Sequence, residues 1–116
     1  MGDKAGLVYI YKKNRKVGVI QKDLIMYVNC HGRNIHIGTP IIEVEHNGTL
    51  KDTKEKLGDE QFVQVNKSDL VNLKFVFYTD LSSVTMRDGM VFPVTPAYSS
   101  NFNSRMLNYY VNREHL

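Results

Sequence analysis

The sequence predicts a mainly β fold of stacked antiparallel hairpins, with one short helix in mid-chain and a second helix near the C-terminal end. Residues 7–45 hold five short apolar segments, and the turns between them are too short for crossover helices. Beyond Pro96 the apolar residues recur at helical spacing and no longer alternate. A chain of 116 residues suits one core, so we expect a single domain over residues 1–116.

The N-terminal part of the chain is expected to form five strands. Their segments are rich in β-branched and aromatic residues, which favour strands. Turn residues separate them, and Gly32 in particular can adopt a positive φ. The expected strands cover residues 7–11, 17–21, 24–30, 34–37 and 41–45.

A short helix is expected over residues 50–57. Thr49 is followed three residues later by Asp52, which is the spacing of a capping box. Leu50 and Leu57 fall on one helical face, and Gly58 is typical of a C-terminal stop. This helix is expected to cover one side of a sheet.

Residues 62–73 are the most informative stretch of the second half. Apolar and polar residues alternate from Phe62, which predicts a strand with one face on the core and the other toward solvent. A polar cluster follows at residues 66–69, and the chain then returns to the core at Leu70. Within the cluster, Lys67 and Ser68 are suited to holding an anionic oxygen.

The remaining elements are a strand, a hairpin and a helix. A strand is expected at 74–78. Asp-Gly at 88–89 predicts a hairpin between 82–86 and 90–95, whose second arm lies at a sheet edge because Pro93 cannot donate a backbone hydrogen bond. A helix is expected at 97–111, followed by a frayed tail at 112–116.

Composition and charge exclude several classes of protein. No apolar run approaches the ~20 residues of a membrane helix, and no signal-peptide core follows Met1, so we expect a cytoplasmic domain without membrane contact. The single cysteine, Cys30, is expected to be a small buried residue in a reducing compartment.

The net charge of +3 permits binding to nucleic acid without requiring it. Four cations crowd one early turn: Lys12, Lys13, Arg15 and Lys16. They indicate either a basic face of the domain or simply a solvated charged turn.

The sequence contains no recognisable catalytic or cofactor motif. The four histidines lack metal-ligand spacing, and there is no phosphate-binding glycine loop. His36 alternates with two isoleucines and is expected to be a half-exposed strand residue. We therefore expect a non-enzymatic protein without a metal or cofactor.

The order of elements and the motif at residues 62–73 resemble the LytTR family of bacterial DNA-binding domains. That family carries a pattern close to Phe-x-Arg-x-His-[Arg/Lys]-Ser-x-x-Val-Asn, then an Asp-Gly hairpin, then Pro-Val-Ser-Arg-x-Tyr. The matching segments here are Phe62–Asn72, Asp88-Gly89 and Pro93–Tyr98, and the resemblance extends from about Leu7 to Leu107. It implies a fold that is an elongated stack of small antiparallel sheets.

The resemblance implies a transcription regulator that reads the major groove of duplex DNA with loops between strands. The implied DNA-binding residues are Arg33, Asn66, Lys67, Ser68 and Thr95. Arginine on a turn can make two hydrogen bonds to guanine, and lysine and serine suit phosphate. Asn66 is expected either to read adenine or to cap the end of its strand, and Ser68 to offer a phosphate its hydroxyl or its backbone N–H.

Three positions depart from the family pattern. Gln64 and Asn66 stand where arginine and histidine are usual, and Pro96 stands where the family has a DNA-reading arginine. Two interpretations follow. Either the sequence preference differs, with Arg33, Lys67 and the basic turn compensating, or the domain is a protein-interaction module without specific DNA binding. A small hydrolase-like or ligand-binding β domain is a third, weaker alternative.

The resemblance also implies partners. Such domains usually follow a receiver or a membrane sensor, as outputs of two-component response regulators. We therefore expect this chain to be the C-terminal part of a longer regulator, and expect a homodimer on repeated DNA sites.

Overall fold

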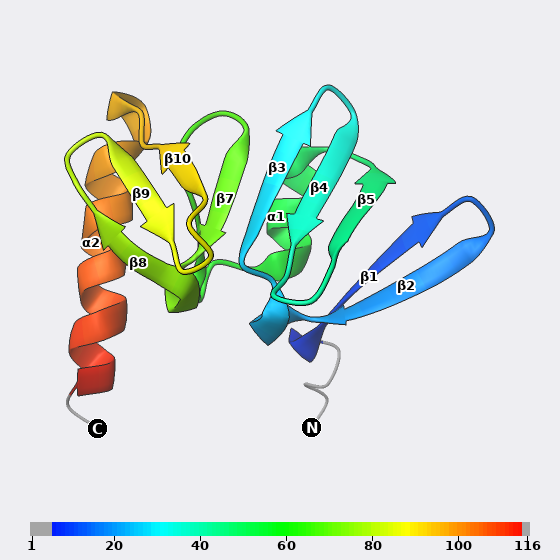
Figure 1. Cartoon of the computed structure of the whole chain (residues 1–116), viewed down its shortest axis with the longest axis horizontal. Helices are drawn as coiled ribbons and strands as arrows, with labels where there is room; N and C mark the ends of the chain where they lie inside the picture. The colour runs from blue at the N-terminus through cyan, green and yellow to red at the C-terminus, as the bar shows by residue number, and fades with distance from the viewer. Residues whose placement is uncertain (1–5, 115–116) are drawn as a thin grey trace.

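The computed structural model describes residues 6–114, and the side chains of residues 6–112. The described chain contains ten strands in three antiparallel sheets and two α-helices, which confirms the mainly β class. The sheets stand side by side along the long axis of a molecule measuring 42 × 36 × 24 Å (Figure 1). The elongated stack expected from the resemblance is therefore confirmed.

The first sheet is a two-stranded hairpin at one end of the molecule, and the second is the five-stranded sheet at its centre. The hairpin comprises β1 (Val8–Lys13) and β2 (Lys16–Gln21). The central sheet has the order β5-β4-β3-β7-β6. Its strands are β3 (Tyr27–His31), β4 (Asn34–Gly38), β5 (Glu43–Asn47), β6 (Phe62–Gln64) and β7 (Asp69–Asn72).

The third sheet and the C-terminal helix form the other end of the molecule. The sheet has the order β10-β9-β8, with strands β8 (Val76–Thr79), β9 (Ser83–Met86) and β10 (Val91–Pro93). Helix α2 (Pro96–Glu114) follows it, and helix α1 (Leu50–Leu57) lies behind the central sheet (Figure 1). The Asp-Gly hairpin and the edge position of Pro93 are both confirmed.

Several predicted boundaries were wrong by two or three residues. The apolar segments at 24–30 and 74–78 each begin as a 3-10 turn, at Lys22–Leu24 and Leu73–Phe75, before the strand starts. The strand expected at 41–45 is shifted to Glu43–Asn47 because the side chain and backbone of Thr39 bond Ile42 and close a turn there. The helix at the C-terminal end continues to Glu114, so residues 112–114 are helical; residues 115–116 lie outside the described residues.

The alternation at residues 62–66 does not separate a core face from a solvent face. Both faces of β6 and β7 are buried, because the central sheet lies between two hydrophobic clusters. Phe62 and Leu70 pack toward β1 and α1, whereas Val63 and Val71 pack toward the third sheet and α2. The described residues therefore form two apolar clusters, not one core. The stretch at residues 62–73 joins them.

The short helix α1 forms as its sequence signals predict. The Thr49 hydroxyl accepts a hydrogen bond from the backbone N–H of Asp52 at 3.1 Å, and Gly58 ends the helix with a φ of 77°. Thr53 and Leu57 are buried against the central sheet. A capping hydrogen bond of this kind stabilises a helix by about 1 kcal/mol.

Candidate nucleic-acid interface

Three connections that carry the predicted DNA-binding residues meet along one edge of the molecule. They are the β3–β4 turn, the β6–β7 loop and the β10–α2 junction, all at the top of Figure 1. Backbone hydrogen bonds hold neighbours together: Cys30 N–H donates to Ser68 O at 2.9 Å, and Thr95 N–H donates to Val65 O at 3.0 Å. The β6–β7 loop therefore lies between the other two connections.

Arg33 lies on the tight turn between β3 and β4. The turn depends on Gly32, whose φ of 62° is unfavourable for residues with a Cβ. The carbonyl of Arg33 accepts a hydrogen bond from Gly48 N–H at 2.9 Å, which ties the turn to the start of α1. The Arg33 side chain is exposed and has no ion-pair partner within the described part of the chain.

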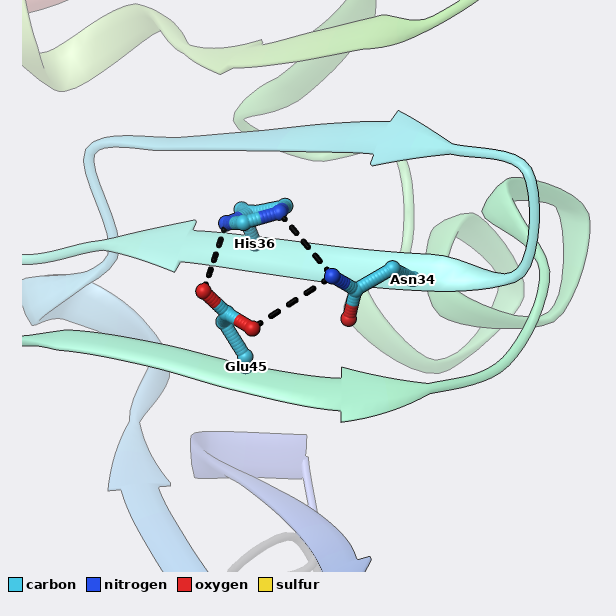
Figure 2. Close-up of polar contacts among 3 residues, drawn as sticks. All are labelled: Asn34, His36 and Glu45. Atoms are coloured by element: carbon cyan, nitrogen blue, oxygen red, sulfur yellow. Dashed lines mark hydrogen bonds and ion pairs between the residues drawn. The ribbon is translucent and has the colours of Figure 1, made fainter.

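A cluster of three polar side chains braces the base of that turn (Figure 2). Asn34 Nδ2 donates to His36 Nε2 at 3.2 Å and to Glu45 Oε1 at 3.3 Å, and His36 Nδ1 lies 3.4 Å from Glu45 Oε2. Since Nε2 accepts, a neutral His36 ring carries its proton on Nδ1, facing the carboxylate. His36 is half-exposed, as predicted, and the cluster ties β4 to β5 immediately behind Arg33.

Asn66 is a buried residue with only 7% of its surface exposed. Its Nδ2 donates to Asp69 Oδ2 and to Pro93 O, both at 2.8 Å, and its Oδ1 accepts from Ser68 N–H at 2.8 Å. Asp69 also accepts a hydrogen bond from Asn29 Nδ2. Of the two roles expected for Asn66, this geometry supports the cap at the strand end.

Lys67 and Ser68 lie at the outer side of the same loop. Lys67 is exposed and has no ion-pair partner in the portion of the chain that is described. The backbone N–H of Ser68 is occupied by Asn66 Oδ1, so only the hydroxyl of this half-exposed residue remains to meet a phosphate. Of the two donors expected for Ser68, this geometry favours the hydroxyl.

Thr95 joins the third sheet to α2. Its carbonyl accepts from Tyr98 N–H at 2.9 Å in the first turn of the helix, and its side chain is half-exposed. Pro96, which is exposed, is the first residue of α2 and offers no donor. Between β10 and α2, Thr95 is the residue with a polar side chain.

Gln64 holds a position that sequence reasoning did not resolve. Its Nε2 donates to Asn66 O at 3.0 Å, and its Oε1 accepts from Lys54 Nζ at 3.3 Å. Gln64 therefore supports the loop from below and orients a lysine of α1 beside it. Sequence alone could not have found Lys54, because the helix and the loop are brought together only by tertiary packing.

An acidic turn borders the α2 end of this edge. Asp80 lies in the β8–β9 turn, where the backbone N–H groups of Ser82 and Ser83 hold the pKa of its carboxyl below the usual range. Val94 N–H donates to Ser82 O at 2.9 Å, so this turn adjoins the β10–α2 junction. The cationic part of the edge consequently lies on the side of Arg33 and Lys67.

The described chain offers no alternative metal centre. It contains no group of three or more histidine, cysteine, aspartate or glutamate side chains that could hold a metal ion. No helix within the described residues is long and apolar enough to cross a membrane. Cys30, expected to be buried, is only half-buried, and its thiol donates to Gly32 O at 3.3 Å.

Comparisons with known proteins agree with this geometry. The model of the LytTr DNA-binding domain family matches residues 7–107. Among solved structures, the chain resembles one from Bacillus cereus, described as the LytTr DNA-binding domain of a methyl-accepting/DNA response regulator. That match has a TM-score of 0.72 at 18% identity and covers 85% of this chain and 95% of that chain, which shows a shared fold. A search of curated proteins found no match. Since the family model spans most of the sequence, the chain belongs to the LytTR family of DNA-binding domains.

Proposed function

We propose that this domain binds duplex DNA sequence-specifically as part of a transcription regulator, with its strand-connecting turns in the major groove. Family membership supports DNA binding by a regulator in general. The observation that carries the finer proposal is the alignment of three turns along one edge, with Arg33 and Lys67 exposed on adjacent turns and unpaired within the described residues.

In this proposal Arg33 is the residue that reads a base. Its turn is narrow and fixed by Gly32, by the bond to Gly48 and by the cluster around His36. A guanidinium held in this way can make two hydrogen bonds to the O6 and N7 atoms of guanine, worth about 1–3 kcal/mol of discrimination.

The β6–β7 loop provides phosphate contacts. Lys67 supplies the charge and the Ser68 hydroxyl a hydrogen bond, while Asn66 holds both in place from the interior. The Thr95 hydroxyl provides a third polar contact at the far side of the loop. Because Pro96 donates nothing, we infer that the base preference at this end is weaker than at Arg33.

The wider setting follows from the same proposal. We expect a non-enzymatic output domain of a bacterial two-component response regulator that acts in the cytoplasm. It would be controlled by a receiver or sensor domain and act as a homodimer on repeated DNA sites. A protein-interaction role without specific DNA binding is the competing function, and the absence of a donor at Pro96 favours it.

A binding-site selection tests the proposal. The wild-type domain is used to enrich duplexes from a random pool, and affinity for the enriched duplex is measured against a scrambled duplex. We expect a salt-dependent preference for the enriched duplex. Arg33→Ala should reduce that preference by roughly 5- to 150-fold, because a bidentate base contact is lost. Lys67→Ala should weaken binding to both duplexes alike. Failure to enrich any sequence would contradict specific binding and support the protein-interaction role.

A further inference from the structure

The hairpin of β1 and β2 ends in an unusually concentrated group of cations, which we call the basic tip. Its members are Lys12, Lys13, Arg15 and Lys16. The turn is only two residues long, and Asn14 adopts the positive φ of 59° that such tight hairpin turns require. All four basic side chains are exposed, and none has an ion-pair partner within the described part of the chain. Nothing in the three-turn interface uses them.

The hairpin is fixed at its base and is not a loose solvated loop. Tyr9 is 1% exposed, and its hydroxyl lies 2.7 Å from His46 Nε2 and 3.4 Å from Thr53 Oγ1. Tyr11 stacks on the His46 ring at a centroid distance of 5.3 Å. The Tyr11 ring also covers Gly18 on the opposite strand so closely that a Cβ there would lie 2.1 Å from a ring atom of Tyr11. These contacts set the direction in which the hairpin projects.

The basic tip lies at the end of the long axis away from α2. In Figure 1 the hairpin projects obliquely, outward from the end of the molecule and partly toward the side of the three turns, and its tip is set back from their edge. A set-back position does not suit insertion into a groove. It suits a contact with the sugar-phosphate backbone by long lysine and arginine side chains, which carry charge and need no exact geometry.

The distribution of charge along the molecule indicates toward which end a bound duplex extends. Asp80 lies near α2 at one end of the molecule, where its carboxylate repels phosphate, and the basic tip lies at the opposite end. The long axis of 42 Å corresponds to about 12 base pairs at ~3.4 Å each, more than one turn of B-DNA. A bound duplex of about 12 base pairs would therefore reach from the three turns to the basic tip.

We propose that the β1–β2 hairpin is a preformed arm whose basic tip binds the DNA backbone on one flank of the site that the three turns read. The arm extends the footprint on one side only and adds affinity without sequence preference. This inference rests on the proposed function, since it requires that the three turns contact DNA.

Two matched triple variants test the arm. The arm variant carries Lys13→Gln, Arg15→Gln and Lys16→Gln. The control variant carries Lys22→Gln, Lys74→Gln and Arg87→Gln, which removes the same residue types from segments at the opposite edge (Figure 1). Both lose three positive charges, so any difference reflects position. Thermal unfolding should show that both remain folded.

The probe is a duplex selected by the wild-type domain and extended by about 10 base pairs, one helical turn, on each side. Affinity is measured over a series of KCl concentrations, and the contacted backbone is mapped by hydroxyl-radical footprinting. We expect the arm variant to reduce the slope of log K against log[KCl] by about 2 to 3, since each phosphate contact contributes ~0.9. Its footprint should shorten on one flank, while its preference over a scrambled duplex is unchanged. The control variant should behave as the wild type.

Two results would overturn the proposal that the hairpin is a DNA-binding arm. One is an arm variant with the slope and footprint of the wild type. The other is a control variant that lowers the slope equally, because the effect would then be general charge. Either result leaves the proposed function intact if the wild type still prefers its selected duplex. A wild type without any preference would instead refute the proposed function.

Discussion

Asn66 and Lys67 are neighbours with opposite tasks. Asn66 makes three hydrogen bonds inside the protein, whereas Lys67 is exposed and unpaired within the described residues. The sequence placed both among the DNA-binding residues, because a polar cluster after a strand gives no sign of which side chains turn inward. The burial of Asn66 depends on tertiary structure, since the carbonyl that accepts from its side chain belongs to Pro93, which is distant in the sequence.

The two residues should therefore separate stability from binding. Asn66→Ala removes three hydrogen bonds and leaves the buried Asp69 with fewer donors, so we expect a loss of about 3 kcal/mol in the free energy of unfolding. Lys67→Ala should change that free energy by no more than ~0.5 kcal/mol. Urea unfolding measures both. Equal stability of the two variants would refute the supporting role of Asn66.

Tyr9 provides a pH-dependent test of the joint between the hairpin and α1. Burial raises the pKa of Tyr9 above its ordinary 10.0. The unfolded chain therefore loses this proton first as pH rises, so the stability from a neutral Tyr9 is complete below pH 10.0 and declines as pH rises toward the folded value.

The variant Tyr9→Phe removes this contribution and leaves His46 Nε2 without its partner. We expect it to cost about 1–2 kcal/mol near neutral pH. We also expect the difference from wild type to shrink above about pH 10, where Tyr9 begins to ionise in the unfolded chain. Guanidinium unfolding at several pH values provides the comparison. A difference that stays constant through this range would argue against a buried, neutral Tyr9.

At the scale of elements, the sequence predicted the type of almost every helix and strand but not their limits. Strong local signals held, such as the Thr49 cap and the Asp-Gly hairpin, because neighbouring residues alone determine them. The 3-10 turns at Lys22–Leu24 and Leu73–Phe75 were missed, because Leu24 and Phe75 also fit the apolar strand segments that follow them. The clustering of the three turns was expected only from the family resemblance. Local sequence does not determine strand order, because the order depends on pairing between strands that are distant in the sequence.

The β3–β4 turn should depend on its glycine. Gly32→Ala places a Cβ at a φ of 62°, so we expect a loss of about 1–2 kcal/mol of stability and weaker DNA binding through a shifted Arg33. Gly6→Ala is the matched control, because Gly6 has open space around it and an ordinary φ. Thermal unfolding and a binding assay report the two effects. Unaltered binding by a destabilised Gly32→Ala variant would show that the turn does not position Arg33 for DNA.

At the scale of the whole molecule, the central sheet explains how the β6–β7 loop of the interface is held in place. Its strands β6 and β7 are buried on both faces between two apolar clusters, so the loop that joins them is anchored from both sides. A sequence pattern of alternation predicted burial on one side only. It could not predict the second cluster, because that cluster is completed by the third sheet and α2 from much later in the chain.

The proposed interface requires that the three turns at one edge contact DNA together. Titration of the ¹⁵N-labelled domain with its selected duplex, followed by amide chemical-shift changes, tests this directly. We predict the largest changes at residues 31–34, 66–68 and 94–96, and negligible changes at residues 87–89 in the turn at the opposite edge (Figure 1). Changes concentrated at the opposite turn, or spread evenly over the surface, would contradict the account.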